Sequence, residues 1–191
     1  MLDAILTNGY LAGQFLVAMP IMADPRFERS VIYICAHAAE GSMGIVINQP
    51  MDNLEFPDIL EQLGIQSTLA CEKITVHCGG PVESARGFVL HSSDYDMDGT
   101  MSVNDDVSLS ATTEVLKAMA YGTGPERSLM ALGYAGWGAG QLDGEIKQNT
   151  WLTVPADTDL LFAYDARDKW DKALGKIGIT SASLSGQAGS A

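Results

Sequence analysis

The feature that most constrains the fold is a glycine-rich stretch, Ala131–Leu152, which reads ALGYAGWGAGQLDGEIKQNTWL. The residues around its start, Leu129–Tyr134, are apolar enough to form a buried strand. Leu142 and Ile146 lie one helical turn apart, which predicts a helix that begins at Gln141. Since glycine adopts positive φ without strain, we expect the chain to turn between strand and helix. The glycines of this turn are Gly133, Gly136, Gly138 and Gly140.

A glycine-rich turn between a strand and a helix N-terminus can also hold a phosphate on free backbone N–H groups. The dinucleotide pattern G-x-G-x-x-G fails here, because Gln141 stands where a pattern starting at Gly136 requires its last glycine. No G-K-[ST] follows either. We therefore favour tight packing of Tyr134 and Trp137 against the body of the protein, with phosphate binding as the alternative.

The size and composition of the chain fit one globular domain with a large core, because 47% of its 191 residues are hydrophobic and 18% are charged. We predict a single domain over residues 1–180 and a mobile tail over residues 181–191, which are small and polar. No apolar run reaches the ~20 residues that span a bilayer. The first residues lack the basic segment of a secretory signal, so we expect a cytoplasmic protein.

The charge balance is strongly acidic, with 11 basic against 24 acidic residues and a net charge of −13. Nucleic-acid binding depends on Lys and Arg side chains that neutralise phosphates. The one basic-rich segment, Arg167–Lys176, is interleaved with Asp168 and Asp171. We therefore expect no direct binding of DNA, no membrane attachment, and a protein or small molecule as the partner.

Apolar patterns predict strands and helices that do not alternate in a regular βαβ rhythm, which favours the α+β class. The segment Ser30–His37 is apolar on both faces, as in a central buried strand. The other predicted strands are Phe15–Met19, Ile45–Ile47, Ile74–His77, Arg86–His91, Val107–Leu109 and Trp151–Pro155. Further helices are predicted at Phe56–Leu63, Thr113–Tyr121 and Lys169–Lys176.

Two more segments are distinctive: FERSVIYICAHAAEGSMGIVINQP at Phe27–Pro50 and GGPVESARGFVLH at Gly79–His91. Together with the glycine-rich stretch they resemble the AlgH/YqgE family, and the resemblance runs from about Gly13 to Gly189. It implies a bifurcated, mostly antiparallel sheet folded into a pseudo-barrel, with helices packed outside. It also implies a regulatory context, but no agreed biochemical activity. Family members often end in glycine and histidine, whereas Ser190 follows Gly189 here.

The candidate ligand site consists of polar and glycine residues at predicted strand ends. Arg86 follows a Gly-Gly-Pro turn, and an arginine can bind a carboxylate through two parallel hydrogen bonds. If the strands pair, one cleft binds a small anionic ligand or a carboxylate-bearing peptide. Alternatively, Arg86 pairs with Glu83 and has only a structural role. The predicted site residues are Asn48, Gly79, Gly80, Arg86, His91, Trp137 and Gln141.

An acidic segment has the spacing of a calcium-binding loop, with Gly99 at the sixth position. The flanking segments look like strands rather than the helices of an EF-hand, so we favour a solvated hairpin loop. The possible metal ligands are Asp94, Asp96, Asp98 and Asp105.

Other catalytic and metal motifs are missing from the sequence. It contains no CxxC, HExxH or G-x-S-x-G pattern. The cysteines, Cys35, Cys71 and Cys78, are odd in number, and we expect reduced thiols. We therefore predict a binding protein without a cofactor. The alternative is an enzyme of unknown reaction with a polar cleft near the glycine-rich stretch.

Overall fold

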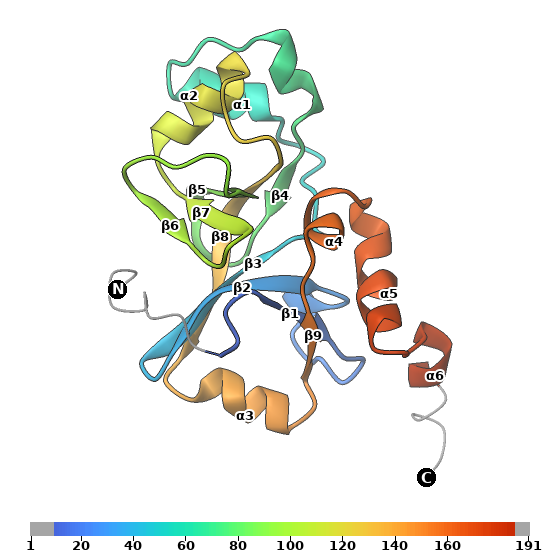
Figure 1. Ribbon diagram of the computed structural model, residues 1–191. Helices are drawn as coiled ribbons and strands as arrows, with labels where there is room; N and C mark the ends of the chain where they lie inside the picture. The colour runs from blue at the N-terminus through green and yellow to red at the C-terminus, as the bar shows by residue number, and fades with distance from the viewer. Residues whose placement is uncertain (1–9, 186–191) are drawn as a thin grey trace.

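The computed structural model describes residues 10–185, which form one curled sheet with helices on both of its sides (Figure 1). The strands are β1 Gln14–Ala18, β2 Val31–Ala38, β3 Gly41–Val46, β4 Val76–Cys78, β5 Val82–Ser92, β6 Thr100–Ser102, β7 Val107–Ser110, β8 Ser128–Gly138 and β9 Trp151–Pro155. The α-helices are α1 Phe56–Gln62, α2 Thr113–Tyr121, α3 Gln141–Lys147, α4 Thr158–Phe162, α5 Ala166–Lys176 and α6 Ser181–Ser185. Two 3-10 helices, η2 Pro25–Phe27 and η3 Leu69–Lys73, lie in the loops.

The sheet has the strand order β6-β7-β5-β8-β3-β2-β1-β9, and β4 pairs with β8 outside this path. All the pairings between these strands are antiparallel except that of β4 with β8. The α+β class, predicted from the irregular order of strands and helices, is confirmed. The sheet also has the bifurcated, curled form that the family resemblance implied.

The bifurcation is at β8, because its two halves belong to different parts of the sheet. The first half, up to Leu132, pairs with β5 and β4, and Ala135–Gly138 pairs with β3, while Tyr134 between them pairs with Val82 at the start of β5. Gly133 separates the halves with a φ of 72°. The prediction that the chain turns over all four glycines is therefore wrong. The strand runs through Gly136 and Gly138, and the turn lies at residues 139–140, directly before α3.

The glycines that the bifurcation requires are Gly79, Gly80 and Gly133, where two backbone segments cross. A Cβ on Gly133 would lie 2.3 Å from the carbonyl oxygen of Gly80, and a Cβ on Gly80 would lie 2.1 Å from the carbonyl carbon of Tyr134. A Cβ on Gly79 would lie 2.3 Å from the carbonyl oxygen of Gly133. Side chains at these positions would force the two segments apart.

Alternating side chains on the strands fill three hydrophobic clusters. In β1, Phe15 belongs to the cluster inside the curled sheet, while Leu16 belongs to the outer cluster under α3. In β2, Tyr33 and Ile34 alternate in the same way, which explains why this strand is apolar on both faces. Helices α4 and α5 close the inner cluster, and α1 and α2 cover the outer face of the β4–β5–β8 region.

Most of the predicted strands and helices are present, and their bounds differ from the predicted ones by at most four residues. Helix α2 has its predicted bounds, and Gly122 ends it with a φ of 73°. Strand β6 and helix α4 were not predicted. In the segment predicted to be a mobile tail, residues 181–185 form α6, and residues 186–191 lie outside the described residues, so the tail's mobility stays a prediction. Between residues 10 and 185, none of the helices is both long and apolar enough to cross a membrane.

Candidate functional site

Two residues of the predicted site, Asn48 and His91, have structural roles. The Asn48 side chain accepts a hydrogen bond from the Val31 N–H at 2.8 Å and donates one to the Arg29 carbonyl at 2.9 Å, so it fixes the start of β2. His91 is fully buried. Its Nε2 lies 2.9 Å from Ser110 Oγ and its Nδ1 lies 2.9 Å from the Ser92 carbonyl oxygen. Burial lowers the pKa of His91.

Arg86 lies on the surface in an irregular part of β5, where no pairing with β8 is formed. Its guanidinium is 3.4 Å from Glu83, as the structural alternative predicted, and it also lies over the Phe88 ring. Gly79 and Gly80 are buried at the crossing with β8. The seven predicted residues therefore do not form one cleft, and the prediction of a shared rim is wrong.

Trp137 and Gln141 do lie together, beside a cavity of about 500 Å³. Gln141 Oε1 accepts the Gly138 N–H at 3.0 Å, and its amide donates to Glu145 at 2.9 Å. The other carboxylate oxygen of Glu145 accepts the indole N–H groups of Trp137 at 3.0 Å and Trp151 at 2.8 Å. The polar groups of this glycine-rich corner are thus engaged with one another.

In the acidic loop, the Asp94 carboxylate accepts hydrogen bonds from Ser92 Oγ and from the Glu126 N–H. These bonds hold the carboxylate in a turn and lower its pKa. Within residues 10–185, no group of three or more His, Cys, Asp or Glu side chains is placed to hold a metal ion. Residues 100–102 of the predicted calcium loop form β6. Calcium binding by Asp94, Asp96, Asp98 and Asp105 is not supported by this geometry.

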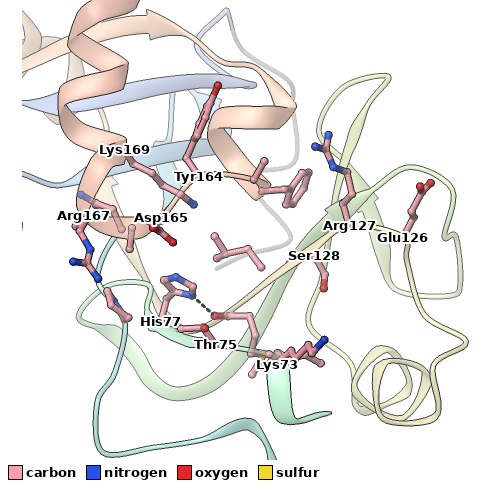
Figure 2. Close-up of a pocket in the computed structure, with 18 residues that line it drawn as sticks. Lys73, Thr75, His77, Glu126, Arg127, Ser128, Tyr164, Asp165, Arg167 and Lys169 are labelled. Carbon is pink, nitrogen blue, oxygen red and sulfur yellow. Dashed lines mark hydrogen bonds between the residues drawn. The ribbon is translucent and has the colours of Figure 1, made fainter. Parts of the chain in front are cut away.

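A large cleft lies elsewhere, between the α4–α5 corner and the β4–β8 pair, and has a volume of about 820 Å³ (Figure 2). Its four cationic side chains come from three separate parts of the chain: Lys73, Arg127, and the pair Arg167 and Lys169 on α5. Among the described residues, only two carboxylates, Glu126 and Asp165, line the same cleft. A protein with a net charge of −13 therefore has a locally basic cleft.

Lys169 is the most unusual of these cations, because only 3% of it is exposed. Its Nζ donates hydrogen bonds to the carbonyl oxygens of Leu161 at 2.7 Å and Ile47 at 3.2 Å. No carboxylate of the described residues lies within ion-pair distance of it. Burial without a counter-charge lowers the pKa of Lys169 from 10.5 to about 8.

His77 lies across the cleft on β4 and is also buried. Its Nδ1 is 3.1 Å from the Met130 carbonyl oxygen, which can only accept a hydrogen bond. A proton on Nδ1 makes this hydrogen bond. Burial lowers the pKa of His77, and the charge of Lys169 contributes in the same direction. The imidazole is neutral at pH 7.

The remaining cations differ in whether they already have a partner. Arg127 already forms an ion pair, since its guanidinium lies 2.7 Å from the Asp159 carboxylate and also over the Phe162 ring. Lys73 and Arg167 have no ion pair with the described residues, and both are exposed. The cleft therefore presents free positive charge to an incoming anion.

The buried amine makes stability depend on pH in a defined direction. Between the folded pKa of about 8 and the unfolded value of 10.5, the unfolded chain binds more protons, so the free energy of unfolding rises with pH. We expect wild type to gain about 2–3 kcal/mol relative to Lys169→Met between pH 7 and pH 10. Urea unfolding of both proteins across this range measures the difference, and a difference that is constant with pH contradicts the assignment.

Of the predicted site residues, Asn48 lines the basic cleft, but sequence reasoning missed the cations of the cleft and His77, although two of these residues carried signals. His77 was considered only as a metal ligand beside Cys78, and Lys169 was only the first residue of a predicted helix. A lysine among core positions of α5, next to buried Trp170 and four residues before buried Ala173, could have been noticed from the helical period. The carbonyl groups of Ile47 and Leu161, which accept hydrogen bonds from Lys169, could not have been identified from the sequence.

The fold and the cleft define a class of small α+β protein, built on one bifurcated sheet with a basic cleft beside the strand that the two halves share. The chain belongs to the AlgH-like family, whose model matches residues 15–182. A UPF0301 protein of Rhodospirillum rubrum is 60% identical over 184 residues, with 96% of each chain covered. A UPF0301 protein of Mesorhizobium japonicum is 52% identical over 191 residues, covering 96% of this chain and 94% of the relative.

Solved structures agree with this assignment. The solution structure of the AlgH protein from Pseudomonas aeruginosa has a TM-score of 0.80 and 43% identity, covering 97% of this chain and 98% of that one. A crystal structure of a Corynebacterium diphtheriae protein has a TM-score of 0.70 at 21% identity, with 90% of each chain covered. The second likeness extends to the fold alone.

Proposed function

We propose that this protein binds a small anionic ligand in the cleft between the α4–α5 corner and the β4–β8 pair. The observation that carries the proposal is the gathering of four of the chain's 11 basic residues around one cleft of about 820 Å³ in a protein with a net charge of −13. Unpaired cations at such a site attract carboxylate or phosphate groups. Buried hydrophobic side chains such as Leu129 and Met130 complete the lining.

The biological role that we propose is regulation in the cytoplasm through this ligand, without direct binding of DNA. The acidic net charge supports the second part, because no basic stripe is available for a phosphate backbone. The enzyme near the glycine-rich stretch is the weaker candidate. Glu145, the carboxylate at that cavity, is occupied by three hydrogen bonds, so it is not free to act as a base.

The test is calorimetric titration of malonate and, separately, inorganic phosphate, which distinguishes a carboxylate site from a phosphate site. We expect the Kd of the preferred anion to rise about tenfold in Lys73→Gln/Arg167→Gln, a loss of about 1.4 kcal/mol. The matched control is Lys117→Gln/Lys147→Gln, which removes two charges from α2 and α3. An equal loss in both double variants, or no binding of either anion to wild type, contradicts the proposal.

A further inference from the structure

The amine of Lys169 lies at the wall of the cleft, where it can react with a bound molecule as well as attract an anion. Figure 2 shows its side chain reaching from α5 to the wall of the cleft, with His77 and Thr75 on the opposite side. Two carbonyl oxygens, of Ile47 and Leu161, accept hydrogen bonds from Nζ and fix its position. An ammonium group has three N–H bonds, so one remains unused, and loss of that proton leaves a lone pair.

The surroundings favour the neutral amine over the ammonium. The groups that bond to Nζ are backbone carbonyls rather than a carboxylate. His77, the imidazole that lines the described part of the cleft, cannot supply a negative charge. The burial that lowers the pKa to about 8 leaves roughly one amine in ten unprotonated at pH 7. For an exposed lysine this fraction is smaller by a factor of about 300. A desolvated lysine of this kind is a nucleophile for carbonyl groups.

The cleft also offers what a carbonyl-bearing acid requires. The free cations Lys73 and Arg167 can attract its carboxylate, while the hydroxyl of Ser128 lies on the same wall as Leu129 and Met130. A ligand that carries a carboxylate beside a ketone would present both groups to the cleft at once. The chemical class that matches is the 2-oxo acids.

We propose that Lys169 captures a small 2-oxo acid as a reversible Schiff base, a step that rests on the proposed anion site. The lone pair of Nζ forms a bond to the ketone carbon, while the carbonyl electron pair moves to oxygen. That oxygen takes a proton from water and the nitrogen loses one, which gives a carbinolamine. The carbinolamine then loses its oxygen as water, with one further proton from solvent, and a protonated imine remains. No electrons are gained or lost, so no oxidant or reductant is needed.

The test traps the imine in the full-length wild-type protein with pyruvate and sodium cyanoborohydride, followed by peptide mass mapping. Lys172 and Lys176, which are exposed on the same helix, serve as internal controls. We expect the reduced adduct to form at least about tenfold faster at Lys169 than at either control at pH 7. The rate at Lys169 should increase between pH 7 and pH 8.5. Equal labelling of the three lysines, or no adduct at Lys169, overturns the proposal.

Two further measurements separate this proposal from the anion site and from a purely structural lysine. L-lactate carries the carboxylate but no ketone, so its binding to wild type measures the anion site alone. If lactate binds and pyruvate leaves no adduct on Lys169, the Schiff base is excluded while the anion site stands. If neither lactate nor pyruvate binds, both proposals fail. Lys169→Arg, which keeps the charge, should give no adduct at position 169, while Lys172 and Lys176 are labelled at their wild-type rates.

Discussion

Gly80→Ala and Gly133→Ala should each lower the free energy of unfolding by about 2–6 kcal/mol, because positive φ and overpacking both oppose the new side chain. Gly80 has a φ of 149° and Gly133 a φ of 72°. The added Cβ would lie 2.1 Å from the nearest backbone atom at the first position and 2.3 Å at the second. Since typical domains have only about 5–15 kcal/mol of stability, urea unfolding should shift strongly or the folded yield should collapse.

The matched control is Gly138→Ala in the same strand as Gly133. Gly138 has no positive φ, and its added Cβ would have Gln141 Oε1 as the nearest atom, at 3.9 Å. We expect its unfolding midpoint to stay within about 0.5 kcal/mol of wild type. Equal destabilisation by Gly133→Ala and Gly138→Ala would show that the crossing of the two backbone segments is not a special constraint.

Glu145→Ala should produce the second large loss, about 2–4 kcal/mol, because it leaves two indole N–H groups without an acceptor. One carboxylate oxygen of Glu145 accepts hydrogen bonds from both Trp137 and Trp151. The centroids of the two indole rings lie 6.1 Å apart in an edge-to-face arrangement, and both side chains are nearly fully buried. Chemical denaturation, followed by tryptophan fluorescence, measures both the stability and the local environment.

Two further variants of α3 serve as a partial rescue and as a control for Glu145→Ala. Glu145→Gln keeps one acceptor oxygen, and we expect it to recover at least half of the loss. Lys147→Ala removes an exposed side chain from the same helix and should be close to neutral. A neutral Glu145→Ala would mean that the Trp137 and Trp151 N–H groups do not depend on this carboxylate.

The fold was predictable where local pattern and burial agree. Ser30–His37 is apolar on both faces, and β2 indeed separates the inner cluster from the cluster under α3. The spacing of α2 and the glycine after it determined both ends of that helix. The glycine-rich stretch was harder, since glycines permit a turn without requiring one. In β8 the pairing with β3 keeps residues 135–138 extended.

The candidate site was much less predictable, because its residues meet only through the topology of the sheet. Lys169 bonds to the carbonyl of Ile47, which is 122 residues earlier in the chain. His77 comes opposite α5 because β4 pairs in parallel with β8, and such a pairing has no local sequence signal. By contrast, the proximity of Arg86 and Glu83 was predictable as a surface ion pair three residues apart.

Strand β8 pairs with β5 and β4 along one half and with β3 along the other, and this limits how the sequence can change in length. Side chains alternate along a strand, so the loss or gain of one residue moves every following side chain to the opposite face. In a strand that borders one sheet, such a change disturbs one set of pairings. In β8 a deletion next to Gly133 would misplace either the partners of β5 and β4 or those of β3. Length variation is therefore compatible with the hairpin tips and the termini, whereas β8 must keep its residue count.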